Sequence, residues 1–163
     1  MKVLVSACVL GQNVRWNGTN KLSFSLKEWA CSNGITLVPV CPEDELFGTP
    51  RAPIRLIHID DTNMAMMKGK DVASILQKKC SEIYERNPDI VGFIGISRSP
   101  SCGISVGVKN LGRVVKGSMH KTTQVPTVEY NQLRNEKGRQ QFLRRLKKFY
   151  EHICTGQRPQ KSG

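Results

Sequence analysis

Three cysteines each lie a few residues after a short apolar run that is rich in β-branched side chains. The cysteines and the runs before them are Cys8 after 3–5, Cys41 after 35–40 and Cys102 after 90–96. Short runs of this kind, bounded by turn residues, are typical of buried parallel strands. Because ligands of open α/β sheets bind at the carboxyl ends of the strands, the sequence predicts that these three thiols meet at one edge of a sheet.

Thiols placed in this way allow several kinds of chemistry. Structural zinc normally takes four ligands that include closely spaced pairs, and the sequence has no C-x2-C pair. A nucleophilic cysteine needs a histidine base, and none of His58, His120 and His152 lies in a strand-end loop. An iron–sulfur cluster can take three thiolates from separated loops and leave one iron open as a Lewis acid. Three thiols buried without a shared role are the remaining alternative, and spacing alone does not decide among these.

The elements expected around these loops alternate between strand and helix. An amphipathic helix over 21–31, capped by Ser23 or Asn20, separates the first two runs, and a second helix begins at Asp71 and ends near residue 87. A short strand over 126–130 and a helix over 133–153 follow the third run. This pattern predicts an α/β fold with a mainly parallel sheet flanked by helices, and the site lies at the carboxyl ends of its strands.

Two stretches carry no clear periodicity. Residues 41–71 contain several prolines and acidic residues, which predicts a long ordered loop that carries function, with an edge strand over 54–59. The methionines at 64, 66 and 67 are expected to pack beneath this loop rather than to bind metal. His58 is expected at the surface or in a hairpin. Residues 103–124 show neither the apolar spacing of a helix nor that of a strand.

The bulk properties indicate one soluble domain. The chain has 163 residues, which predicts one domain over 1–153 and a polar, disordered tail over 154–163. No apolar run approaches the ~20 residues that span a bilayer, and the N-terminus does not resemble a signal peptide, so we expect a cytoplasmic protein. Six cysteines in such a chain do not indicate a disulfide framework.

The net charge of +12 favours anionic partners. Much of the excess lies in the last predicted helix, which makes RNA contact through this helix a hypothesis. The alternative is that the basic residues serve solubility, since no RNA-binding motif accompanies the helix.

Three motifs resemble those of the thiouracil desulfidases, a small bacterial family. They are Ser-Ala-Cys-Val-Leu-Gly with Val-Arg-Trp-Asn-Gly at 6–11 and 14–18, Val-Cys-Pro-Glu with Thr-Pro-Arg at 40–43 and 49–51, and Arg-Ser-Pro-Ser-Cys-Gly at 98–103. The motifs occur in the family's order and the resemblance covers about residues 1–105. It implies a [4Fe-4S] cluster bound by Cys8, Cys41 and Cys102. It further implies removal of sulfur from 2-thiouracil or a related base, giving the oxo base and sulfide without net redox change.

The resemblance also suggests roles for five polar residues. Glu43, two residues after Cys41, is placed to act as a general base or acid for water. Ser101, beside Cys102, is the second catalytic candidate, since it can donate a hydrogen bond to cluster sulfide or to a carbonyl of the base. Arg15, Arg51 and Ser99 are expected to bind the substrate, and the two arginines alternatively screen an anionic cluster. A plain ion pair of Glu43 with an arginine, and serines that only form the turn, are the structural alternatives.

Three functions are therefore compared. The first is a cluster-dependent desulfidase acting on a free thiolated pyrimidine. The second is the same chemistry on 2-thiouridine in tRNA, favoured by the charge. The third is a non-catalytic metal- or cluster-binding module that contacts RNA or a partner protein.

Overall fold

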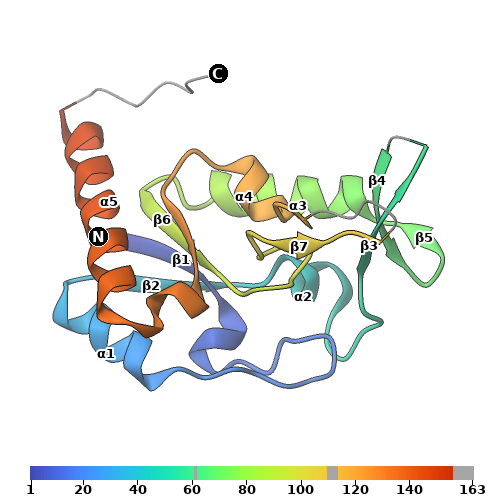
Figure 1. Cartoon of the computed structure of the whole chain (residues 1–163), viewed down its shortest axis with the longest axis horizontal. Helices are drawn as coiled ribbons and strands as arrows, with labels where there is room; N and C mark the ends of the chain where they lie inside the picture. The colour runs from blue at the N-terminus through green and yellow to red at the C-terminus, as the bar shows by residue number, and fades with distance from the viewer. Residues whose placement is uncertain (61, 110–113, 156–163) are drawn as a thin grey trace.

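A four-stranded parallel sheet forms the centre of the computed structural model, which describes residues 1–60, 62–109 and 114–155 (Figure 1). Its strands are β1 (Lys2–Ser6), β2 (Thr36–Val40), β6 (Ile90–Gly95) and β9 (Thr127–Glu129), in the order β2-β1-β6-β9. All three neighbouring pairs are parallel. Every residue of β6 is buried, which explains its continuous apolar sequence. The predicted α/β class with a mainly parallel sheet is confirmed.

The strand order places a ligand-binding crevice beside β1. From β1 the chain first moves to β2 on one side, and later enters β6 on the other side. Where the connections after two adjacent parallel strands run to opposite sides of the sheet, a crevice opens at the carboxyl ends of those two strands. The loops after β1, β2 and β6 all leave the sheet at this edge, because the three strands are parallel.

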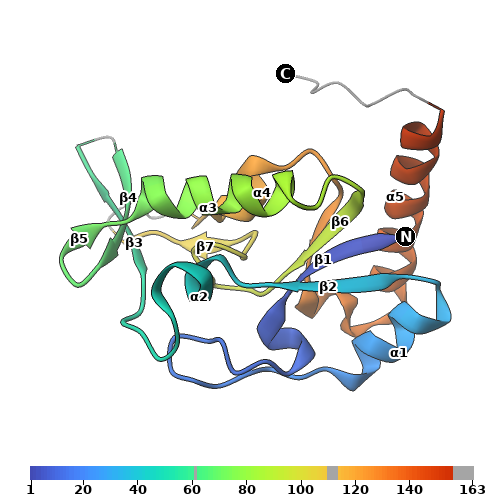
Figure 2. The ribbon, with the colours of Figure 1, turned by 180° about the vertical axis from the view of Figure 1, so that it is seen from behind.

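Helices cover both faces of the sheet (Figures 1 and 2). On one face, α1 (Phe24–Ser32) and α5 (Glu136–Cys154) share an apolar core with β1 and β6. On the other face, α3 (Ala73–Glu85) and α4 (Ser118–Thr122) pack in a second core. The first helix is capped as predicted, since Ser23 Oγ accepts a hydrogen bond from Leu26 N at 3.2 Å.

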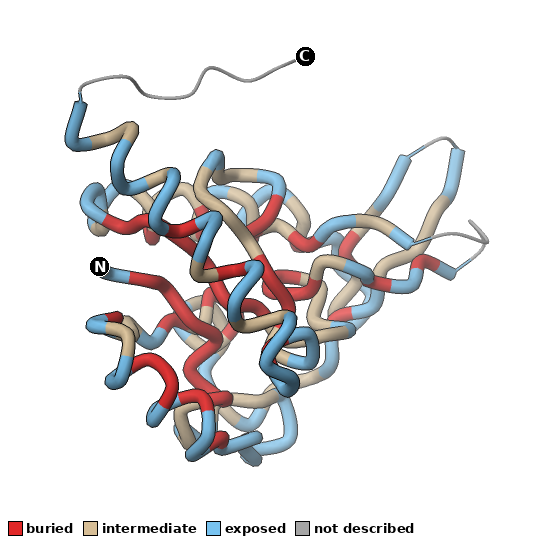
Figure 3. The backbone as a smooth tube through the Cα atoms, turned by 60° about the vertical axis from the view of Figure 1, so that its left-hand side comes forward, coloured by how far each residue is buried: buried red, intermediate tan, exposed pale blue. Residues whose placement is uncertain are grey.

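The last helix packs closely on the sheet through one narrow side. Phe142 and Leu146 are its buried residues, and the remaining surface is mostly exposed (Figure 3). A Cβ on Gly92 of β6 would lie 2.4 Å from a Leu146 methyl group, so a glycine is needed for this close contact. The helix begins at Glu136 rather than at 133, because Asn135 caps it and 130–134 form a 3-10 turn, η2 (Tyr130–Arg134).

The expectation of an irregular loop over 41–71 was wrong. Its first part forms α2 (Pro42–Phe47), and a three-stranded antiparallel sheet follows, made of β3 (Arg55–Ile59), β4 (Thr62–Met67) and β5 (Lys70–Asp71). Only the strand near 54–59 had been predicted. The extra strands escape a periodicity search because this sheet buries little of their length and is held by its own small core around Ala65 and Leu76. The small sheet projects at one end of the molecule (Figure 1).

Short elements fill the remaining segments. They are η1 (Ala7–Leu10), β7 (Val106–Gly107) and β8 (Val114–Val115). Asp71 contacts the start of α3 as expected, accepting a hydrogen bond from Ala73 N. Of the predicted polar tail, Cys154 ends α5, whereas 156–163 lie outside the described residues. None of the described helices combines the length and the apolar character needed to cross a bilayer.

Candidate active site

A cavity of about 290 Å³ opens at the carboxyl ends of β1, β2 and β6. All eight predicted site residues line it: Cys8, Arg15, Cys41, Glu43, Arg51, Ser99, Ser101 and Cys102. They come from four separate loops and turns, and only the parallel sheet brings them together. The structure therefore agrees with the predicted meeting of the three thiols at one edge.

Each thiol is held by a different local structure. Cys8 lies in η1, which continues directly from β1, and Cys41 is the N-cap residue of α2. Cys102 follows β6 in a tight turn closed by a hydrogen bond from Gly103 N to Ser99 O at 2.8 Å. Gly95 lets this turn fold back onto β6, since a Cβ there would lie 1.8 Å from Cys102 O.

The three thiols interact electrostatically with one another. Burial, with the neighbouring Cys41 as the next cause, raises the pKa of Cys8 to about 11. Burial likewise raises the pKa of Cys41 to about 12, with Cys102 as the next cause, and that of Cys102 to about 12. Without a bound cation these thiols hold their protons at neutral pH. All three are free of disulfides.

The three thiols line the same cavity. Within 1–60, 62–109 and 114–155, no group of three or more His, Cys, Asp or Glu side chains has the geometry of a single-ion site. The thiols instead lie on the wall of the cavity. Three thiols from separate segments are a donor set of the kind that an iron–sulfur cluster takes.

A buried carboxylate links two of the cysteine-bearing loops. Glu43 Oε1 accepts hydrogen bonds from Ser101 Oγ at 2.7 Å and from Ser99 Oγ at 3.2 Å. Glu43 Oε2 accepts from Arg51 Nη2 at 3.1 Å. Ser101 Oγ also lies 3.5 Å from Cys102 Sγ. Glu43 and Ser101, each predicted as a catalytic residue, are therefore in direct contact beside a thiol.

Arg51 lines the cavity, but its side chain is almost fully buried among protein groups. Its side chain is only 5% exposed, and it bonds Glu43, Val14 O at 3.0 Å and Gly48 O at 3.1 Å. Its Nη2 lies 4.0 Å from Cys41 Sγ. The ion pair with Glu43 was the structural alternative considered for both residues. The predicted contact between Arg51 and substrate stays a prediction.

The other two predicted substrate-binding residues are more accessible. Arg15 is half-buried, donates to Thr19 Oγ1 at 3.0 Å and lowers the pKa of Cys8. Ser99 Oγ accepts a hydrogen bond from Cys102 N at 3.1 Å, so this serine also shapes the turn.

Several cavity residues were missed from the sequence. Trp16, which is 46% exposed, and Arg98, which has a φ of 64°, line the cavity, as does Ser6 at the end of β1. A large exposed aromatic side chain in a strand-end loop is the signal that could have pointed to Trp16. The left-handed backbone conformation of Arg98 cannot be predicted from the sequence, because arginine rarely adopts it.

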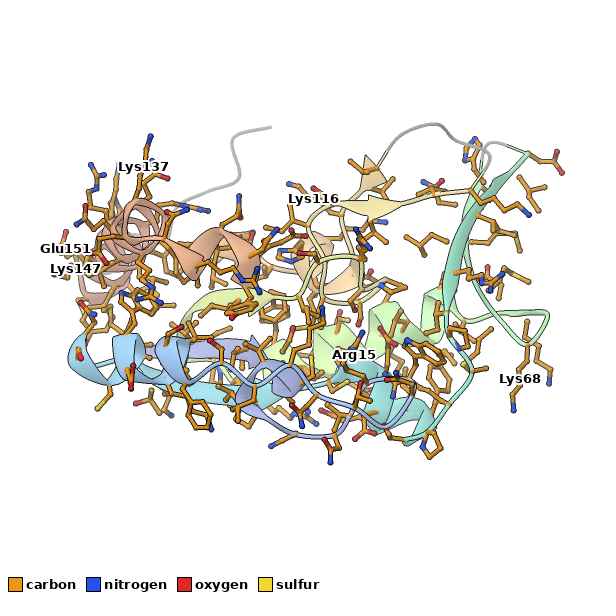
Figure 4. The ribbon with its side chains drawn as sticks, turned by 60° about the horizontal axis from the view of Figure 1, so that its bottom comes forward. Arg15, Lys68, Lys116, Lys137, Lys147 and Glu151 are labelled. Atoms are coloured by element: carbon orange, nitrogen blue, oxygen red, sulfur yellow. The ribbon has the colours of Figure 1, made fainter. Side chains whose placement is uncertain are left out.

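The basic helix lies away from this cavity. Figure 4 shows Lys137 and Lys147 on α5 at one end of the molecule, well separated from Arg15. Arg139 and Arg145 use their guanidinium groups on backbone carbonyls of the protein itself. The geometry gives no specific support to RNA contact through this helix.

Comparisons with known proteins show the family and the fold of the chain. The model of a family described as 2-thiouracil desulfurase matches residues 3–130. A solved structure described as a [4Fe-4S]-dependent thiouracil desulfidase, TudS, is similar with a TM-score of 0.63 and 23% identity. This similarity covers 81% of the present chain and 92% of that one. Comparison with curated proteins found no match. The chain belongs to the 2-thiouracil desulfurase family.

Proposed function

We propose that this protein is a [4Fe-4S]-dependent desulfidase that converts the C=S group of a free 2-thiouracil-like base to C=O. The observation that carries the proposal is the convergence of three strand-end thiols and the Glu43–Ser101 pair on one cavity, in a chain of this family. In the reaction, water adds its oxygen to the thione carbon, the C–S bond breaks, and sulfur leaves as hydrosulfide. No oxidant or reductant is consumed.

The cavity wall fits an anionic group rich in sulfide. Cys8, Cys41 and Cys102 supply thiolate ligands of the type that iron–sulfur clusters use. Two buried polar atoms of the wall, Ser6 Oγ and Arg51 Nε, have no hydrogen-bond partner among the described residues. Ser6 lies near the Cys102 thiol and lowers its pKa, without a hydrogen bond of normal geometry. Both residues line the cavity, and each leaves a buried polar atom without a protein partner there.

With three protein thiolates, a bound cluster would supply one iron that is open as a soft Lewis acid for the thione sulfur. The protein supplies the proton chemistry. Glu43, fixed by Arg51 on one oxygen and by two serines on the other, accepts a proton from the attacking water. Ser101, hydrogen-bonded to Glu43, passes or returns that proton near the reacting atoms. We assign these two residues the catalytic role.

The substrate is held by the outer part of the wall. Arg15 presents a guanidinium donor to the carbonyl oxygen of a pyrimidine, and Trp16 presents an aromatic face for stacking. Ser99 binds the same oxygen when its hydroxyl hydrogen turns from Glu43 to the substrate. We expect Arg51 to act mainly by fixing Glu43 and by screening the cluster charge, because its side chain is almost fully buried. Free thiols and a cluster suit a reducing compartment, so we place the protein in the cytoplasm.

The family match does not favour the alternatives. A non-catalytic module would not need the buried Glu43–Ser101 pair beside the thiols. Desulfuration of tRNA would use a basic surface beside the cavity, whereas the lysines labelled on α5 lie at the far end of the molecule (Figure 4). A cavity of about 290 Å³ whose lining includes Arg15, Ser99 and Ser101 suits a small polar ligand such as a free base.

Anaerobic purification followed by an activity assay tests the proposal. We expect brown protein with iron and acid-labile sulfide in equal amounts, and stoichiometric release of uracil and sulfide from 2-thiouracil. Activity at high ionic strength should match that at low ionic strength, since no polyanion is bound. Protein that contains zinc instead, or a cluster-loaded protein that leaves 2-thiouracil unchanged, would refute it.

A further inference from the structure

A second buried carboxylate supports the Cys102 turn from behind. Glu129 is the last residue of β9 and is 7% exposed. Its backbone pairs with Gly95, the last residue of β6, so the two strands end side by side. The chain leaves β6 into the segment 96–105, which carries Ser99, Ser101 and Cys102. Glu129 is absent from the wall of the cavity, although Ser97 lines it.

The Glu129 carboxylate holds both ends of this segment. Its Oε1 accepts hydrogen bonds from Ile104 N at 2.8 Å and Ser105 N at 3.0 Å. Its Oε2 accepts one from Ser97 Oγ at 3.1 Å. One side chain thus joins residues before and after the turn, so it fixes the distance between the two ends of the turn.

The middle of the segment is fixed by other contacts. Backbone N–H groups of Gly117, Ser118 and Met119 donate to the carbonyls of Gly103, Pro100 and Ser101. His120 Nε2 lies 2.9 Å from Cys102 O and donates to it, because a carbonyl only accepts. The α4 region therefore holds the back of the turn, and Glu129 holds its two ends.

We propose that Glu129 is a positioning residue that sets the place of Cys102 and Ser101 by clamping the ends of the segment 97–105. The inference rests on the proposed function, in which Cys102 binds the cluster and Ser101 assists Glu43. Glu129 does not touch the reacting atoms. Its effect on chemistry passes through the geometry of the turn, which must hold a ligand and a hydroxyl to within a fraction of an ångström.

The clamp depends on acceptor geometry rather than on charge. No lysine or arginine among the described residues forms an ion pair with Glu129. In Glu129→Gln, the amide oxygen can still accept from both backbone N–H groups, and the amide nitrogen can donate to Ser97 Oγ, whose hydroxyl can turn to accept. In Glu129→Ala both ends are released, and the N–H groups of Ile104 and Ser105, together with that of Gln132 in the capping box of η2, lose their acceptor.

Asp71 provides a matched control outside the site. Its Oδ1 accepts hydrogen bonds from Ala65 N at 3.0 Å and Ala73 N at 2.9 Å, so it also joins two segments through a carboxylate. Asp71→Ala removes a comparable pair of backbone bonds in the small sheet, without contact to the cysteine turns.

The test compares these variants in two forms of the whole protein. In the apoprotein, amide hydrogen exchange should rise at least tenfold across 97–105 in Glu129→Ala, stay close to wild type in Glu129→Gln, and be unchanged there in Asp71→Ala. In the cluster-loaded protein, iron release to a chelator should be at least tenfold faster in Glu129→Ala than in Asp71→Ala or Glu129→Gln. Ser97→Ala, which removes one end of the clamp, should lie between wild type and Glu129→Ala.

Two results would overturn the clamp. One is unchanged exchange across 97–105 in Glu129→Ala, and the other is a Glu129→Gln variant as impaired as Glu129→Ala. If Glu129→Ala fails to fold, the clamp is tested with Ser97→Ala and Glu129→Gln. A Ser97→Ala variant whose amide hydrogen exchange across 97–105 equals that of wild type would then contradict the clamp. Wild-type protein that binds no iron would refute the proposed function instead, while the exchange measurement still decides the clamp.

Discussion

Replacing Glu43 by glutamine separates proton chemistry from cluster binding. The carboxylate accepts hydrogen bonds on both sides, from Ser99 and Ser101 on Oε1 and from Arg51 on Oε2. A glutamine of the same shape can accept on one side only. Its oxygen will face Arg51, because two donors facing each other there would be costly, and its amide nitrogen will then donate toward the serines. The Ser101 hydroxyl must turn to accept, so it loses the proton path to residue 43.

The size of the effect follows from these contacts. Loss of a positioned general base costs about 10²–10⁴ in rate, which corresponds to about 3–5 kcal/mol in the barrier. The thiols stay in place, the bond from Arg51 loses its charged acceptor, and the two serine hydroxyls must turn, for a stability cost of about 1–3 kcal/mol. We therefore expect Glu43→Gln to keep iron, sulfide and colour and to lose turnover by at least a hundredfold.

Glu45→Gln is the matched control. Glu45 lies on the same helix, pairs with Arg86 and does not line the cavity. Both variants and wild type should be loaded with cluster, assayed for iron per chain, and followed for sulfide release from 2-thiouracil under saturating substrate. Turnover of Glu43→Gln within about threefold of Glu45→Gln, at equal iron content, would remove Glu43 from the proton chemistry and leave it as a partner of Arg51.

Further predictions address the ligands, the turn and the substrate. Cys102→Ser should lose cluster and turnover together, with iron below half of the wild-type content; a fully loaded variant would contradict the ligand assignment. Gly95→Ala should lower the free energy of unfolding of the apoprotein by at least about 3 kcal/mol in urea titration, because the new Cβ meets the Cys102 carbonyl at 1.8 Å. Gly107→Ala is its control, because a Cβ at Gly107 would have no atom within 4 Å. Equal free energies of unfolding for the two variants would show that the Cys102 turn can move to make room for the new Cβ. Trp16→Ala should raise KM roughly 5- to 150-fold with little change in kcat, from the ~1–3 kcal/mol of base stacking. Trp16→Phe should restore most of the affinity, and an unchanged KM in the alanine variant would exclude stacking.

Much of the main sheet could be predicted because its strands are buried. Residues 3–5 and 90–95 are continuous apolar runs with turn residues after them, and such runs have few other structures to adopt. The small antiparallel sheet was different, because its strands are half exposed and partly polar, as in β4 (Thr62–Met67). Its formation depends on tertiary packing around Ile54 and Leu76, which no local pattern encodes.

The candidate site shows the same division. The three thiols could be predicted because each follows a recognisable strand, and parallel strands end at one edge. That Glu43 would meet Ser101 across 58 positions of sequence could not, since it depends on the angle at which α2 leaves β2. The position of Arg51 was equally hidden, because only the fold decides whether an arginine in a loop faces solvent or a carboxylate.

Glu129 explains why no spacing argument could have completed the site. Each of the four parallel strands ends in a group that the site uses: β1 leads to Cys8, β2 to Cys41 and β6 to Cys102, while β9 ends in the carboxylate that holds the third turn. The first three groups are recognisable by type, since cysteines after strands indicate ligands. A glutamate at the end of a fourth strand carries no such signal. It gains its role only because the order β2-β1-β6-β9 places β9 next to β6, so its side chain lies beside the segment that carries Cys102. Strand order, rather than residue type, therefore decides which carboxylate is used to build the site.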